Sequence, residues 1–179
     1  MLKFAALALA LAAPIAIATP AHAADVKTLS CVEKNLDKAG RAALNRDLAK
    51  NLQNAGGGQT YGEDTVAALR GAAQTCKAKH GWSEAATQAA ILYTVPKVGW
   101  PLAVQIGRAN GLKPNALLKR VNALTPEEKA EGTSERVISK LATASAEAGE
   151  INADNAAVAG ALYGLLTLKE KAYIDFQKS

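Results

Sequence analysis

The sequence predicts an all-α protein: a compact bundle of about six to eight helices with one disulfide and a buried C-terminal helix. Apolar residues recur every three or four positions, which is the helical period, and no run keeps the two-residue alternation of strands. Glycine, proline, serine and threonine fall between these stretches, where they can begin or end helices. Aromatic residues are few, and alanine and leucine dominate the apolar set.

The first 23 residues have the pattern of a cleaved secretory signal peptide. Lys3 supplies a positive charge, residues 4–18 are uncharged, and Ala21 and Ala23 form the small-x-small pair that signal peptidase recognises. This apolar run is shorter than the roughly 20 residues of a membrane-spanning helix, which disfavours a retained anchor. We therefore expect residues 24–179 to form a single helical domain, periplasmic or secreted, with no transmembrane segment.

The mature chain contains two cysteines, Cys31 and Cys76. An even cysteine count in an oxidising compartment favours a disulfide between them. Two alternatives are less favoured. Acylation of Cys31 would need a lipobox, but Leu29 is one position out of place, and thiol catalysis with His80 would need a thiol that escapes oxidation. One histidine and two cysteines also give no closed ligand set, so we expect no metal and no cofactor.

Three helical stretches are expected before residue 82. We expect the first to be interrupted at Gly40, the second to end before the glycine triplet at 56–58, and the third to end at Gly81. Cys31 and Cys76 lie on the apolar stripes of the first and third stretches, so their bond would clamp these two helices together. The three apolar stripes are Leu29, Val32 and Leu36, then Leu44, Leu48 and Leu52, then Val66, Leu69 and Ala73.

Two prolines are expected to divide the next helix, which Ser83 can cap. The segment TVPKVGWPL at 94–102 places Val95 and Trp100 before prolines, and a residue in that position is disfavoured from helical angles. A short helix would then start at Pro101 and stop at Gly111, and Pro114 would open another. Trp82, Tyr93 and Trp100 surround this expected corner, where they either fill the gap between helices or line a groove.

The remaining chain has clear start and stop signals. Thr125, Pro126 and Glu128 match a capping box with proline at the first helical position. Gly132 is expected to interrupt that helix, Thr133 or Ser134 to restart it, and Gly149 to end it. The last helix should run from about Ala153 to Phe176.

The last helix is expected to be buried, because residues 156–168 carry no charged side chain on any face. Ala156, Gly160 and Gly164 recur every four residues along it. Such a row of small residues predicts close backbone approach by a neighbouring helix in an alanine-rich bundle, which we favour over a ligand site.

Motifs for the common enzyme classes are missing from the sequence. The segment GGGQTYGE lacks the Gly-Lys-Ser/Thr of a phosphate loop, and no Gly-x-Ser-x-Gly accompanies His80. A carboxylate-dependent hydrolase of the cell envelope stays open as the alternative, with Glu63 and Glu84 as acids, although acids are common at helix starts without any catalytic role. We therefore favour a non-catalytic binding or envelope-support module.

Charge distribution gives the strongest indication of a partner. Residues 85–126 contain no Asp or Glu, whereas residues 127–154 contain six Glu and one Asp. A basic face of this kind attracts anionic partners, such as an envelope component or an acidic envelope protein, while nucleic acid is not expected outside the cytoplasm. Mutual neutralisation of the two stretches is the alternative. The candidate binding residues are Lys97, Trp100, Arg108, Lys113, Lys119 and Arg120.

We predict that the exported protein begins at Ala24, because the apolar run and the Ala21/Ala23 pair direct cleavage after Ala23. Intact-mass spectrometry of the exported protein should give the mass of residues 24–179 with one disulfide. A retained Met1, or a diacyl group on Cys31, would contradict this interpretation.

Overall fold

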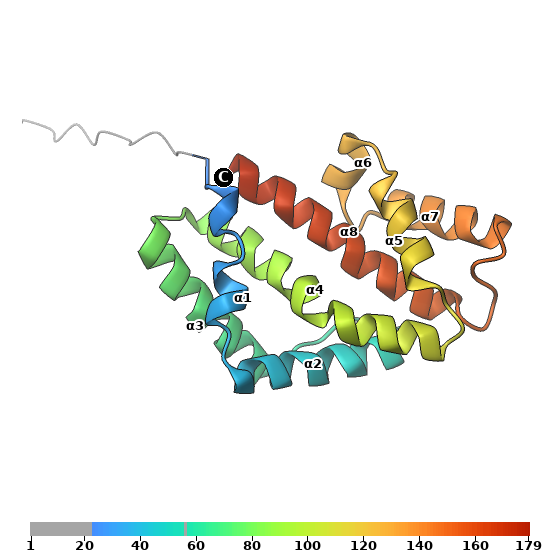
Figure 1. Ribbon diagram of the computed structural model, residues 1–179, viewed down its shortest axis with the longest axis horizontal. Helices are drawn as coiled ribbons and strands as arrows, with labels where there is room; N and C mark the ends of the chain where they lie inside the picture. Colours follow the sequence, from blue (N-terminus) through green and yellow to red (C-terminus); the bar gives the residue numbers. More distant parts are fainter. Residues whose placement is uncertain (1–22, 56) are drawn as a thin grey trace, which may run out of the picture.

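The chain is all-helical in the computed structural model, which describes residues 23–55 and 57–179. Eight α-helices and a short 3-10 helix account for the regular structure of these residues, and they include no strand (Figure 1). The predicted signal peptide lies outside the described residues except for Ala23. The elements are η1 (Val26–Thr28), α1 (Cys31–Asn35), α2 (Lys38–Gln53), α3 (Glu63–His80), α4 (Glu84–Ala109), α5 (Pro114–Asn122), α6 (Pro126–Glu131), α7 (Glu135–Glu147) and α8 (Ala156–Lys178).

Most predicted helix boundaries are confirmed, because local capping chemistry sets them. Gly81 ends α3 in the left-handed conformation, with φ of 65°. The Ser83 side chain accepts a hydrogen bond from the Ala86 amide at 3.0 Å and caps α4. Thr125 and Glu128 form the expected reciprocal capping box at the start of α6.

The expected interruption at Gly40 is wrong. The break lies earlier, between α1 and α2, where the Asp37 side chain accepts a hydrogen bond from the Gly40 amide at 2.7 Å. Asp37 is therefore the N-cap of α2, and Gly40 lies inside that helix.

The expected break at the two prolines is also wrong, since α4 is a single helix that contains both Pro96 and Pro101. A proline inside a helix leaves the carbonyl four residues earlier without its N–H donor, here those of Leu92 and Lys97. Packing from several sides offsets this loss: α4 contacts α8 most extensively and also packs against α2 and α3 (Figure 1). Tertiary contacts therefore override the local signal.

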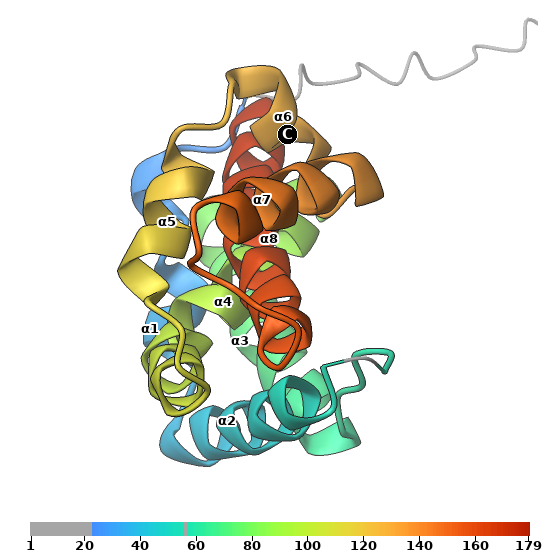
Figure 2. The same cartoon turned by 90° about the vertical axis from the view of Figure 1, so that its right-hand side faces the viewer.

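Two glycines of α4 allow these close contacts. A Cβ on Gly99 would overlap the side chain of Leu48 on α2, and a Cβ on Gly107 would lie 2.9 Å from Cδ2 of Leu162 on α8. At both positions a larger residue would force the facing leucine side chain to move. The views in Figures 1 and 2 place α2 beside one part of α4, while α5, α6 and α7 gather around α8.

Helix α8 is the central C-terminal helix that the sequence predicts. Leu162, Tyr163, Leu165 and Phe176 on α8 are all almost fully buried. The expected close approach along its glycines is wrong, because added Cβ atoms on Gly160 and Gly164 would meet no atom within 4 Å. The glycines that bring helices together lie on α4 instead.

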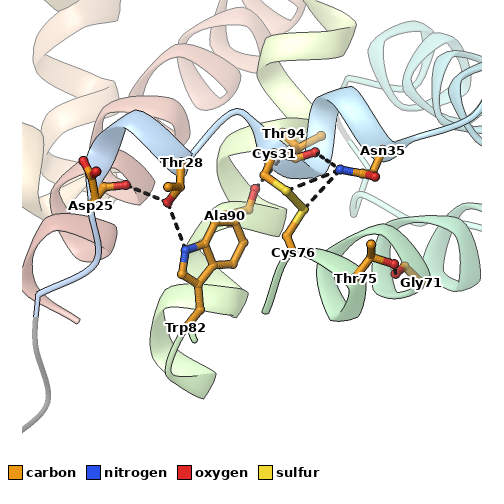
Figure 3. Close-up of a disulfide and its surroundings, with 10 residues drawn as sticks. All are labelled: Asp25, Thr28, Cys31, Asn35, Gly71, Thr75, Cys76, Trp82, Ala90 and Thr94. Carbon is orange, nitrogen blue, oxygen red and sulfur yellow. Dashed lines mark hydrogen bonds between the residues drawn. A yellow bond between two sulfur atoms is a disulfide. The ribbon is translucent and has the colours of Figure 1, made fainter. Parts of the chain in front are cut away.

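The disulfide predicted between Cys31 and Cys76 is present, with Cα atoms 5.9 Å apart (Figure 3). It joins the first residue of α1 to α3. The two cysteines lie in an apolar cluster, separate from the larger core around α4 and α8, that also contains Trp82 and Phe176. The indole N–H of Trp82 donates to the Thr28 hydroxyl at 3.0 Å. The disulfide and this hydrogen bond fix the N-terminal segment to the rest of the bundle.

We predict that Cys31→Ser/Cys76→Ser lowers the free energy of unfolding by up to about 4 kcal/mol, because the lost cross-link closes a long loop of the unfolded chain. The quantity is measured by urea unfolding of the oxidised protein and the double variant. Dithiothreitol serves as the control, since it should destabilise the native protein and leave the variant unchanged. Equal unfolding midpoints for the two proteins would contradict a stabilising role.

Candidate binding site

The basic stretch of the sequence occupies the second half of α4, the turn that follows, and α5. Lys97, Arg108, Lys113 and Lys119 are exposed, whereas Arg120 is half-buried. These residues do not gather in one pocket: Lys97 lines one hollow, Arg108 and Lys113 line another, Arg120 forms an ion pair, and Lys119 belongs to none of these. Charge that is contiguous in the sequence is therefore divided on the surface.

A pocket of about 340 Å³ lies where α4, α5 and α8 meet. Trp100 lines it together with Lys97, so the structure brings together two of the predicted binding residues. Most of the lining is apolar, and no carboxylate belongs to it. The full lining is Pro96, Lys97, Trp100, Pro101, Leu118, Leu166 and Lys169.

The continuity of α4 positions this pocket. Lys97 and Trp100 are three residues apart in one helix, so their side chains project from the same face of α4. Pro96 and Pro101 line the pocket beside them. The prolines that the sequence suggested as a corner therefore form an apolar wall instead.

Helix α8 contributes a lysine that the sequence analysis missed. Lys169 is partly exposed and pairs with Glu170 at 3.5 Å. It is far from the basic stretch in the sequence, and only the packing of α8 against α4 brings it to Lys97. No local pattern could have indicated this proximity.

Arg108 and Lys113 line a different hollow, of about 320 Å³, at the turn between α4 and α5. Leu112, Pro114 and Asn115 complete its lining. Lys119 is exposed on α5 and lines neither hollow.

Arg120 takes part in a partly buried polar network. Its Nε donates to Glu150 Oε2 at 2.5 Å, and the same oxygen accepts from the Ser145 hydroxyl at 3.1 Å. Ser145 in turn shares a 2.5 Å hydrogen bond with the hydroxyl of Tyr163. The hydrogen bond from Arg120 lowers the pKa of Glu150, and burial raises the pKa of Tyr163. This network connects α5, α8 and the segment around Glu150.

The three aromatic residues of the expected corner pack in two different apolar clusters. Trp82 and Tyr93 pack in the cluster around the disulfide, whereas Trp100 packs against the larger core. Only Trp100 lines the pocket between α4, α5 and α8.

The buried carboxylates have structural partners. Asp47 accepts hydrogen bonds from the Thr65 hydroxyl at 2.6 Å and the Gly62 amide at 2.8 Å, and the bond from Thr65 is the main cause of its lowered pKa. Glu128 completes the capping box and accepts from Lys140 at 2.6 Å, which lowers its pKa. A general acid needs the opposite shift, a raised pKa.

The acids named for the hydrolase alternative lie at helix starts. Glu63 and Glu84 are in the first turns of α3 and α4, and Glu84 pairs with Lys77. His80 stacks on Trp82, with ring centroids 5.6 Å apart. Across the described part of the chain, no three His, Cys, Asp or Glu side chains group as a metal site requires.

Comparison of the sequence with family models and with curated proteins found no match, and comparison of the fold with solved structures found none. None of the helices in residues 23–55 and 57–179 is both long enough and apolar enough to span a bilayer.

We predict that Arg120→Gln lowers the melting temperature at pH 7, because it leaves the half-buried Glu150 carboxylate without its cation. Lys119→Gln, the adjacent exposed position, is the matched control and should leave the melting temperature unchanged. Since the folded-state pKa of Glu150 is lowered, the ion pair stabilises the fold above about pH 4 and is lost as the pH falls through the folded pKa. The difference between the two variants should therefore shrink in acid. Equal melting temperatures at pH 7 would show that the network contributes nothing.

Proposed function

We propose that the protein is an exported, non-catalytic binding module whose basic face holds an anionic amphiphile of the cell envelope. The observation that carries this proposal is the pocket between α4, α5 and α8. It combines an apolar wall with the ammonium groups of Lys97 and Lys169, and no carboxylate lines it. An amphiphile with one anionic group is complementary to both features, because its hydrocarbon segment matches the apolar wall and its anionic group matches the lysines.

The apolar wall suits a hydrocarbon segment. Trp100 and Leu118 offer carbon surface that is only partly covered in the free protein, and the buried Leu166 completes this wall. Burying such a segment contributes about 0.8 kcal/mol for each CH₂ group removed from water. The volume of about 340 Å³ lies at the lower end of the range for small-molecule sites, so a short apolar segment would fill it.

The two lysines suit the anionic group. Among the ion pairs of the described residues, Lys169 pairs with Glu170, whereas Lys97 takes part in none. Lys97 is exposed, and its ammonium group can donate hydrogen bonds to a phosphate or carboxylate at the mouth of the pocket. The exposed Lys119, Arg108 and Lys113 extend the positive field over neighbouring surface.

Export is supported by the disulfide together with the N-terminal sequence pattern. Disulfides persist in oxidising compartments and are rare in the reducing cytosol. Anionic lipids and phosphorylated glycolipids are therefore the ligand classes that suit this face.

The hydrolase alternative has less support from the geometry. Asp47, Glu128 and Glu150, the most buried carboxylates described above, are each held by donors that keep them ionised. None of them lines the pocket beside Trp100. A pair of acids facing a cleft at about 5–10 Å, as glycan hydrolysis requires, would be the observation in its favour.

The proposal predicts that the mature protein sediments with vesicles of phosphatidylglycerol but not with vesicles of phosphatidylcholine. Lys97→Glu should reduce this binding strongly, and Lys50→Glu, an exposed lysine on α2, is the matched control with the same charge change. Binding should also weaken as salt rises, because the Debye length falls from about 8 Å at physiological salt to about 3 Å at 1 M.

Tryptophan fluorescence locates the ligand in the same experiment. Phosphatidylglycerol with brominated acyl chains should quench Trp100, which is one of only two tryptophans in the chain, and Trp100→Phe should remove most of the quenching. Equal binding to neutral and anionic vesicles, or equal binding by Lys97→Glu and Lys50→Glu, would refute the proposed function.

A further inference from the structure

A second pocket, of about 290 Å³, lies beside the disulfide and differs in chemistry from the first. Its lining is strongly basic and more polar than that of the pocket at Trp100, which is mainly apolar. Cys31 forms part of its lining. The side chains that matter most are Lys27, Thr28, Lys34, Asn35, Lys79 and His80.

Two segments that are distant in the sequence form the walls of this pocket. Lys27 and Lys34 come from η1 and α1, and Lys79 and His80 come from the last turn of α3. The bond from Cys31 to Cys76 joins these walls covalently. The sequence analysis missed this cluster because the lysines are scattered through balanced stretches.

Several contacts hold the walls in place. His80 stacks on Trp82 with an interplanar angle of 24°, and Trp82 donates to the Thr28 hydroxyl on the opposite wall. The Asn35 amide donates to Cys31 Sγ at 3.3 Å and to Cys76 Sγ at 3.5 Å (Figure 3). Thr28 and Asn35 are thus occupied by protein partners, which leaves the three lysine ammonium groups, the Ser30 hydroxyl and the His80 ring as the donors for a ligand.

The positive charge of the pocket is not neutralised from within. No carboxylate lines it, and the ion pairs among the described residues do not involve Lys27, Lys34 or Lys79. The neighbouring acids have other partners: the Asp25 carboxylate accepts a hydrogen bond from the backbone amide of Lys27 at 2.9 Å, and Glu33 lies near Tyr93. Three ammonium groups at one hollow therefore face solvent without a counter-charge.

We propose that this pocket binds a phosphate-bearing anion. A phosphate monoester carries a charge of about −1.5 to −2 and offers three acceptor oxygens, which matches three lysines better than a single carboxylate does. The lining of this pocket offers less apolar surface for a hydrocarbon chain than the pocket at Trp100 does. Free phosphate, a sugar phosphate and a lipid phosphate share this chemistry.

The disulfide makes this site dependent on oxidation. Helix α1 has only five residues and cannot hold its own position without tertiary contacts. Breaking the bond would remove the covalent link between the wall that carries Lys27 and Lys34 and the wall that carries Lys79, and would leave the hydrogen bond from Trp82 and apolar packing to hold them. Affinity for phosphate should therefore fall on reduction, while the pocket at Trp100 does not contain this bond.

The test is titration of the mature, oxidised protein with inorganic phosphate, pyrophosphate and glucose 6-phosphate at constant ionic strength. Binding is measured by calorimetry and by the NMR signals of the His80 ring. We expect saturable binding that shifts these signals and is tighter for pyrophosphate than for phosphate. Lys34→Gln/Lys79→Gln should weaken it about tenfold or more, whereas Lys38→Gln/Lys50→Gln, at two exposed lysines of α2 with the same charge change, should alter it less than about twofold.

A further arm distinguishes the sources of phosphate. Vesicles of phosphatidic acid that compete with pyrophosphate for the His80 signals would assign a lipid headgroup, and competition only by the sugar phosphate would assign a soluble ligand. Absence of saturable phosphate binding, or equal weakening by both double variants, would overturn the proposal. Because these variants keep the disulfide, the result does not depend on whether the reduced protein stays folded, and failure of the lipid pocket at Trp100 would leave it unaffected.

Discussion

The packing of α4 against α8 is the interaction on which the rest of the structure depends. Helix α4 continues through Pro96 and Pro101 although each proline removes a backbone hydrogen bond. Its neighbours compensate by approaching closely, with Leu48 seated against Gly99 and Leu162 against Gly107. A break at the prolines would change the relative orientation of the two halves of α4 and would disperse the residues that line the pocket at Trp100.

The two apolar clusters of the bundle have different means of support. The larger one surrounds α4 and α8 and is stabilised by burial of leucine, valine and tyrosine side chains. The smaller one, at the N-terminal segment, contains the disulfide, Trp82 and the end of α8 at Phe176. Ile91 on α4 contacts both. The disulfide thus strengthens the part of the molecule where helices are shortest, and the same part carries the basic pocket.

Features that depend on neighbouring residues could be predicted from the sequence. The caps at Ser83 and Thr125 and the helix end at Gly81 follow from chemistry within one turn, and the cysteine pairing follows from count and compartment. The continuity of α4 could not be predicted, because contacts with other helices outweigh the local preference of proline. For the same reason the close-approach glycines were expected on α8 but lie on α4.

The candidate sites show the same difference between features set by neighbouring residues and features set by contacts between helices. Lys97 and Trp100 share a helix face and could be grouped from the sequence, but Lys169 joins them only through the fold. Arg120, grouped with the lysines by sequence, is instead held by Glu150. Lys27, Lys34 and Lys79 meet because the disulfide connects α1 to α3. A run of basic residues in the sequence therefore indicates a basic surface. Which residues share a pocket depends instead on which helices contact one another.

The central claim is that α4 remains one helix across its two prolines. Double electron–electron resonance tests this claim directly. It measures the distance between nitroxide labels on Gln88→Cys and Gln105→Cys, both exposed positions of α4. Seventeen residues of continuous helix at 1.5 Å per residue predict a single, narrow distribution near about 25 Å between the two backbone positions. A broad distribution, or one centred well below this distance, would show that the prolines break the helix and would contradict the account.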